Sequence, residues 1–151
     1  MPDMLSNTSC LIALDNIGNL DILRRLYSSV HISEEVAAEF GVHVPNWIQV
    51  HSVQDITKLN ILHNLVDLGE ASTIALAYQF DDVTLILDDR KARKLADNLN
   101  LRFTGLLGVL IKAKQTGIIG SVENMLALLK TAGFRFSLAM ELQALRLAGE
   151  R

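Results

Sequence analysis

Short apolar runs typical of β-strands alternate with longer stretches of helical periodicity throughout the 151-residue chain. The clearest strand signal is the β-rich run from Val83 to Leu87, and the clearest helical signal is the three-residue spacing of Leu59, Leu62 and Leu65. No tight-turn signal joins two neighbouring strand runs, so consecutive hairpins are not expected. The sequence therefore predicts an α/β fold in which helices cover both faces of a central, mostly parallel sheet.

Half of the residues are apolar, which is enough for one sizeable core, and no internal repeat or low-complexity tract divides the chain. A single domain spanning residues 1–151 is therefore expected. Thr8 and Ser9 are expected to supply the start of the first helix. The expected strands cover residues 4–7, 30–32, 45–50, 83–87 and 101–103, and the expected helices cover residues 8–17, 20–27, 34–40, 56–65, 70–78, 91–99 and 106–114, with two more through Leu128 and Leu145.

The sequence contains no signal for export or for membrane insertion. The first residues lack a basic stretch, and the apolar run that follows them is interrupted by Asp15 and Asn16. No window reaches the roughly 18 uninterrupted apolar residues of a membrane span. Cys10 is the only cysteine, so it is expected to be a small buried hydrophobe rather than half of a disulfide. We therefore expect a cytoplasmic protein.

Polar residues follow the predicted strands at the edge where ligand sites of parallel sheets lie. Asn7 and Ser9 come after the first strand, and Asp88 and Asp89 come directly after the strand 83–87. Glu70 begins the helix that precedes this strand. Because the carboxyl ends of parallel strands meet at one edge of the sheet, we expect these side chains to converge.

Glu39 is a further candidate, since a helical wheel puts it at the border of the face that buries Val36 and Phe40. Together with Glu70, Asp88 and Asp89 it would form a cluster of four carboxylates. Such a cluster repels itself unless a cation lies within it, and hard oxygen ligands select Mg²⁺ or Mn²⁺. The acids therefore predict a divalent metal site.

Other interpretations of these residues stay open at the level of sequence. Glu34 and Glu35 are acids of the kind that the dipole of a helix favours in its first turn. Asp88 could be the N-cap of the helix that follows it. The basic run of Arg90, Lys91, Arg93 and Lys94 could be a solvated helix face or, beside the acids, a phosphate-binding surface. The four histidines lack metal-ligand spacing and are expected to be packed or on the surface, and the net charge of −3 does not exclude nucleic acid because local clustering decides the field.

Five motifs, in the right order, resemble those of the PIN-domain superfamily, in particular its toxin-like branch (VapC-like or DUF3368-type). They extend over essentially the whole chain. The motifs are Leu5 to Leu14, Ile32 to Glu39, Gly69-Glu70-Ala71 with Ile74 to Ala77, Leu87 to Arg93, and Thr104-Gly105 with Leu107 to Leu110, and Ala132 to Arg135 continues the resemblance.

The resemblance implies a three-layer α/β/α fold with a carboxylate pocket, a divalent metal (Mg²⁺ or Mn²⁺) and endonuclease activity on single-stranded RNA. A cognate antitoxin protein and a homodimer are the partners expected with it. On this basis Asp88, Glu70 and Glu39 are the catalytic candidates, and Asn7 and Asp89 complete the metal ligands. Ser9 would hold a water or a carboxylate, and Arg90, Arg93 and Lys94 would contact RNA phosphates.

The sequence departs from the PIN pattern at its first acid, where Asn7 stands in place of the usual Asp. An amide keeps an oxygen ligand but lacks the charge that attracts the ion. A catalytically degenerate PIN domain that binds RNA or a protein without cleavage is therefore the alternative. A receiver-like or phosphatase-like domain fits less well, because the first strand ends without an acid that could serve as nucleophile.

Overall fold

The computed structural model describes residues 3–151 and has a five-stranded, wholly parallel sheet with the strand order β3-β2-β1-β4-β5. This confirms the predicted fold class. The strands are β1 (Asp3–Ser6), β2 (Val30–Ser33), β3 (Ile48–His51), β4 (Val83–Ile86) and β5 (Phe103–Thr104). The helices are α1 (Thr8–Asn16), α2 (Asp21–Leu26), α3 (Glu34–Phe40), α4 (Ile56–His63), α5 (Leu68–Ala77), α6 (Arg90–Asn98), α7 (Leu106–Gln115), α8 (Val122–Thr131) and α9 (Leu138–Leu147).

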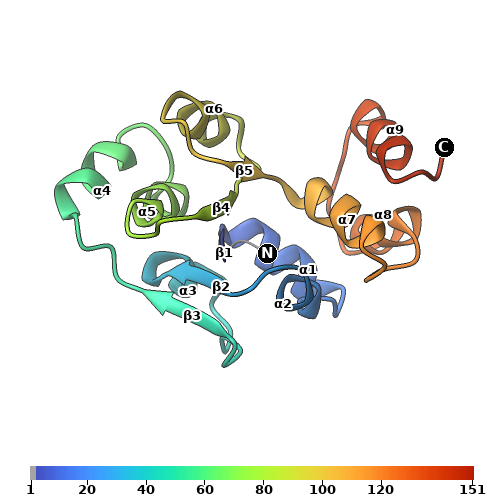
Figure 1. Ribbon diagram of the computed structural model, residues 1–151, viewed down its shortest axis with the longest axis horizontal. Coiled ribbons are helices and arrows are strands. Elements are labelled where there is room, and N and C mark those ends of the chain that lie inside the picture. Colours follow the sequence, from blue (N-terminus) through green and yellow to red (C-terminus); the bar gives the residue numbers. More distant parts are fainter. Residues whose placement is uncertain (1–2) are drawn as a thin grey trace.

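Helices cover both faces of the sheet, as Figure 1 shows for α4, α5 and α6 on one side and α1 and α2 on the other. Neighbouring strand residues alternate between these faces, as strand geometry requires. Met4 and Ile86 belong to the buried cluster on the α1–α2 side, while Leu5 and Leu85 belong to the cluster beneath α4, α5 and α6. The central strands β1 and β4 therefore contribute to two apolar layers, which explains their apolar runs in the sequence.

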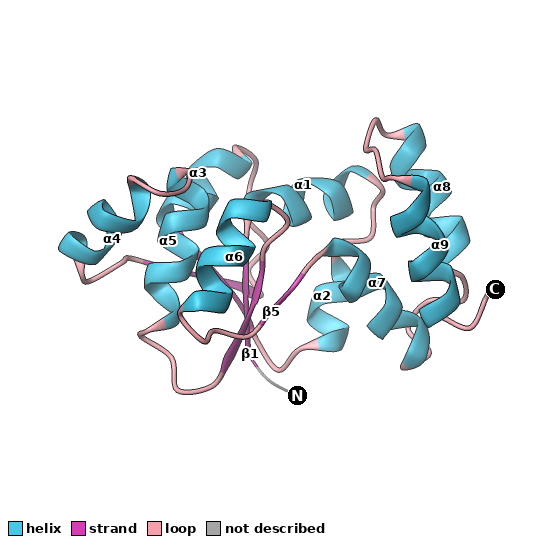
Figure 2. Ribbon diagram, turned by 90° about the horizontal axis from the view of Figure 1, so that it is seen from above, coloured by secondary structure: helices cyan, strands magenta, loops and turns pink. Residues whose placement is uncertain are grey.

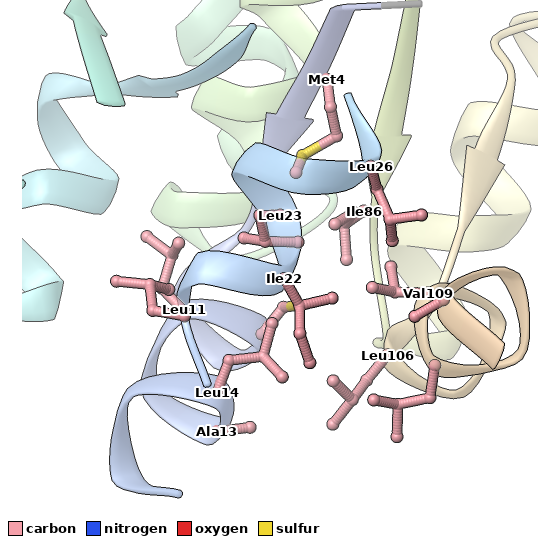
Figure 3. Close-up of a cluster of buried hydrophobic side chains, with 14 of the residues drawn as sticks. Met4, Leu11, Ala13, Leu14, Ile22, Leu23, Leu26, Ile86, Leu106 and Val109 are labelled. Atoms are coloured by element: carbon pink, nitrogen blue, oxygen red, sulfur yellow. The ribbon is translucent and has the colours of Figure 1, made fainter. Parts of the chain in front are cut away.

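The chain after β5 extends the first of these clusters. Leu106 and Val109 of α7 pack beside Ile22, Leu23 and Ile86, in the contact region drawn in Figure 3. Helices α7, α8 and α9 thereby form a layer beside the sheet, on the side far from α4 (Figures 1 and 2). Within residues 3–151, none of the helices has the length and apolar character needed to cross a membrane.

The chain reverses its direction of travel across the sheet between β1 and β4. From β1 it proceeds outward through β2 to β3, then crosses back to β4 on the other side of β1 and continues to β5. Parallel sheets of this kind bind ligands outside the carboxyl ends of the strands at such a switch point. Ser6 pairs with Ile86 in register, so the residues after β1 and β4 emerge side by side.

The differences from the predicted elements are local. The third strand begins at Ile48 rather than at residue 45, and the fifth covers Phe103–Thr104 rather than 101–103. The N-cap of α1 is Asn7, whose Oδ1 accepts a hydrogen bond from the Cys10 amide, rather than Thr8 or Ser9. Residues 1 and 2 of the predicted domain lie outside the described residues.

Candidate active site at the switch point

Asn7 lies at the centre of the switch point, immediately after β1. Its side chain is fully buried, and its backbone amide donates to the carbonyl of Ile86 at 3.2 Å, which ties β1 to β4. While Oδ1 caps α1, Nδ2 donates to Glu70 Oε1 at 3.5 Å. One side chain thus starts a helix and points a polar N–H at a carboxylate 63 residues further along the chain.

Glu70 lies in the first turn of α5 and is only partly exposed. Burial raises the pKa of its carboxyl from 4.5 to about 7, the hydrogen bond from Asn7 opposes this shift, and the negative charges of Asp89, Asp88 and Glu39 reinforce it. Among the described residues, Glu70 Oε2 is buried without a hydrogen-bond partner. The structure therefore brings the four carboxylates within electrostatic reach of one another.

Glu39 reaches the site from the last turns of α3. Thr8 Oγ1 donates to Glu39 Oε1 at 2.5 Å, so the helix that Asn7 caps also holds this second carboxylate. The carboxylate packs against Gly69: a Cβ added there would overlap Glu39 Oε1 and lie 3.1 Å from Cδ. The absence of a side chain at Gly69 is what lets α3 and α5 present Glu39 and Glu70 to the same space.

Asp88 and Asp89 each have one oxygen engaged in helix capping. Asp89 Oδ2 accepts from the amide of Ala92 and is the N-cap of α6. Asp88 Oδ1 accepts from the amide of Leu106, at the start of α7, at 3.0 Å. The open interpretation of Asp88 as the N-cap of the next helix is therefore wrong, because Asp89 has that role while Asp88 stabilises a helix 18 residues away. The second oxygen of each carboxylate is not used by these bonds.

The predicted basic residues line a groove that also has Asp88 in its wall. A depression of about 590 Å³ is lined by Asp88, Arg90, Arg93 and Lys94, together with Asp97, Phe103 and Met140. Spacings of three and four residues on α6 put the three cations on one helix face. A second pocket, of about 280 Å³, shares Asp88 and Arg93 with this groove and includes Ser9 in its wall.

The sequence did not predict the role of Thr8. Its hydroxyl donates to the carboxylate of Glu39, whereas Ser9 was the residue expected to hold a carboxylate. The sequence also did not predict the pairing of His31 on β2 with His51 on β3, whose ring nitrogens lie 2.8 Å apart. The two remaining acidic candidates differ from each other: Glu34 accepts a hydrogen bond from Ser52, whereas Glu35 Oε1 is buried without a partner in the described part of the chain.

The donor set suits a hard divalent cation in charge and in atom type. Glu70 Oε2 is an unpaired buried carboxylate oxygen, and three neighbouring acids raise the pKa of this group. Within residues 3–151, however, no three His, Cys, Asp or Glu side chains stand in a ready-made ligating arrangement. A cation bound here would therefore take at most two of these side chains as direct ligands and its other ligands from water and substrate, as Mg²⁺ commonly does.

Parallel strands, helices on both faces and carboxylates gathered at the switch point define an α/β protein with an acidic cluster at the carboxyl edge of its sheet. A PIN-domain family model (DUF3368) matches residues 3–150, so the chain belongs to the PIN-domain family. PIN domains are typically nucleases that use divalent metal ions. No curated protein matches the sequence.

Gly69→Ala tests the packing of Glu39 against α5. The added methyl group would displace the exposed, flexible carboxylate of Glu39, while Ala favours the helix by up to about 1 kcal/mol over Gly. We expect the free energy of unfolding in urea to stay equal or rise, and Mn²⁺ affinity measured by calorimetry to fall roughly tenfold or more. Gly120→Ala is the control, because no atom lies within 4 Å of its added Cβ. Unchanged Mn²⁺ affinity in Gly69→Ala would remove Glu39 from the site.

The raised pKa of Glu70 predicts a dependence of stability on pH in metal-free buffer. Because the folded-state pKa of about 7 exceeds the ordinary value of 4.5, the native protein binds more protons than the unfolded chain between these values. The free energy of unfolding should therefore fall as the pH rises from about 4.5 to about 7, by on the order of 1–2 kcal/mol after discounting for solvent screening. Glu70→Gln keeps an acceptor for Asn7 and should flatten the dependence of the free energy of unfolding on pH, measured by urea titrations. An unchanged dependence would show that other titratable groups cause it.

Proposed function

We propose that this PIN domain, as a single domain spanning the chain, is a metal-dependent endonuclease that cleaves single-stranded RNA. The observation that carries the proposal is the crowding of Asp88, Asp89 and Glu39 around the buried carboxyl of Glu70 at the switch point. Like charges at this density cost free energy unless a cation compensates them, and groups whose pKa is strongly shifted by burial and by neighbouring charges cluster at functional sites. Membership of a nuclease family supports the same conclusion.

The cation, Mg²⁺ or Mn²⁺, would lower the pKa of a bound water and polarise a phosphate oxygen. Glu70 and Asp88 would hold it, with Asp89 and the amide of Asn7 completing its surroundings. Glu70 has a buried oxygen without a hydrogen-bond partner among the described residues, so it is suited to bind the cation, whose charge would keep this carboxyl ionised. Glu39, steadied by Thr8, would orient the bound water, and Ser9 would hold a water or a carboxylate at the pocket wall.

The basic face of α6 supports RNA as the substrate. Arg90, Arg93 and Lys94 line one groove with Asp88, so a phosphate backbone lying in this groove would present a phosphodiester to the acids. Such contacts do not depend on base sequence. A cognate antitoxin that controls the enzyme, a homodimeric state and a cytoplasmic location complete the proposal, as expected of a toxin-like PIN domain.

Asp88→Asn tests the nuclease proposal without removing the helix cap. Asparagine keeps the Oδ1 that accepts from the Leu106 amide but loses the charge. We expect cleavage of a fluorescent single-stranded RNA in Mn²⁺ to fall roughly 100-fold or more, with little change in the melting temperature. Asp81→Asn, an exposed acid just before β4 and so at the opposite end of that strand, is the matched control. Cleavage by Asp88→Asn at the rate of the parent would exclude Asp88 from the chemistry.

The second candidate function is a PIN domain that binds RNA or a protein without cleaving it. The hydrogen bond from Asn7 Nδ2 to Glu70 favours it, because this N–H stabilises the ionised carboxylate and so does part of what a cation would do. This candidate predicts that purified protein lacks Mn²⁺-dependent cleavage and that binding persists in EDTA.

Asn7→Asp distinguishes the two functions. Aspartate also serves as an N-cap, but here it replaces the donor to Glu70 by a fifth carboxylate. We expect the variant to melt below the parent in EDTA and to recover in Mn²⁺, with Mn²⁺ affinity increased roughly tenfold. If the parent is inactive and the variant cleaves RNA, the natural chain is the degenerate form. Equal Mn²⁺ affinity in both would place residue 7 outside the reach of the ion.

A further inference from the structure

A pocket of about 280 Å³ lies against the acids, between the start of α7 and the segment that joins α8 to α9. Its volume is near the lower end of the roughly 300–1,000 Å³ that small-ligand pockets span. Asp88 and Arg93 belong to both this pocket and the groove along α6, so the two depressions adjoin. In Figure 1 the connection from β5 to α7 runs between α6 and α9. The wall far from the acids consists of Phe134, Arg135, Phe136 and Met140.

The segment carrying this wall is held at both ends. Gly133 adopts a positive φ of 100° at the end of α8, and the amide of Phe134 donates to the carbonyl of Leu129 at 3.0 Å, which closes that helix. At the other end, Ser137 caps α9 by accepting from the amide of Met140 at 3.1 Å. Phe134 and Phe136 are half-buried against the core cluster. The wall is therefore set before any ligand arrives, which lowers the entropic cost of binding.

Two arginines give the pocket a positive lining beside its aromatic rings. The guanidinium carbon of Arg93 lies 5.3 Å from the ring centroid of Phe103, and its Nε is buried with no hydrogen-bond partner among the described residues. Arg135 is exposed. Within residues 3–151, neither arginine forms a salt bridge, whereas Lys130, which lines a neighbouring depression with Arg135, pairs with Glu141. The two arginines outnumber Asp88, the one carboxylate among the described residues that line this pocket, and with the neighbouring aromatic side chains they suit an anionic ligand with a flat ring.

We propose that this pocket is a subsite for one unstacked nucleotide of the single-stranded RNA, next to the phosphate that lies at the acids. Its base stacks on Phe134 or Phe136, and its phosphate meets Arg93 and Arg135. The proposal rests on the proposed function and deepens it, because it assigns part of the affinity to a base rather than to the backbone alone. Stacking on aromatic side chains is sequence-tolerant, since every base has a π-face. The subsite therefore selects single strands over duplexes.

The test uses fluorescence anisotropy in EDTA, with fluorescein-labelled hexaadenylate and versions that carry one abasic residue at each position in turn. We expect one abasic position to weaken binding to the parent protein roughly 5- to 100-fold, as loss of a stacked base does. The double variant Phe134→Leu/Phe136→Leu, which keeps the apolar packing, should bind the intact probe with that same weaker affinity and lose the discrimination. Tyr78→Leu, which removes an exposed aromatic ring at the C-cap of α5, is the matched control.

The salt dependence of RNA binding distinguishes the contribution of the two aromatic rings from that of Arg135. The slope of log affinity against log salt should be unchanged in the double Phe variant and should flatten by about 0.7 in Arg135→Gln, which loses one phosphate contact. Parent protein that binds every abasic probe like the intact one overturns the subsite, even if the double variant fails to fold. Discrimination that survives in a folded double variant also overturns it. If the parent protein discriminates among the abasic probes but does not cleave RNA, the nuclease proposal is overturned and the subsite stands. If it cleaves RNA but binds all probes equally, the subsite is overturned and the nuclease proposal stands.

Discussion

The position of β1 in the middle of the sheet is the constraint on which the rest of the structure depends. Because the chain leaves β1 in one direction and returns on its other side, no helix crosses directly over the ends of β1 and β4. The backbone bond from Asn7 to Ile86 holds these ends together. Helices that belong to different crossovers, α3, α5 and α6, can then direct acids into one space, which no single supersecondary unit could do.

Each of the four carboxylates of the site accepts a hydrogen bond that compensates part of its negative charge. Asn7 donates to Glu70, Thr8 donates to Glu39, and helix-terminal amides donate to Asp88 and Asp89. The helix dipoles of α6 and α7 add positive potential at these two aspartates. Glu70 remains the least compensated member, since burial and three neighbours outweigh one long hydrogen bond. Any bound cation would therefore lower the free energy of ionised Glu70 most.

The sheet, its helices and the convergence of acids at one edge were predictable, because apolar runs and periodicity report burial directly and parallel strands share an edge. The particular contacts were not. Asn7, Thr8 and Ser9 are all good N-cap residues, and only the tertiary register of β1 decides between them. The bond from Asp88 to Leu106 spans 18 residues and leaves no local signal. The pocket at Phe134–Phe136 arises from packing of α7 against α9, which periodicity does not specify. The ligand roles of the acids stay predictions.

The capping bonds of Asp88 and Asp89 bear on how such a protein would change in evolution. Asp89 is the N-cap of α6 and Asp88 accepts from the first amide of α7, and loss of a helix cap commonly costs about 1 kcal/mol. Selection for stability alone would therefore keep both residues in a descendant without nuclease activity. Glu39 and Glu70 cap no helix in the described part of the chain, and Glu70 is there at an electrostatic cost. In related sequences, replacement of these glutamates would therefore be the earlier sign that catalytic activity has been lost. Retained aspartates alone would not indicate that a protein is active.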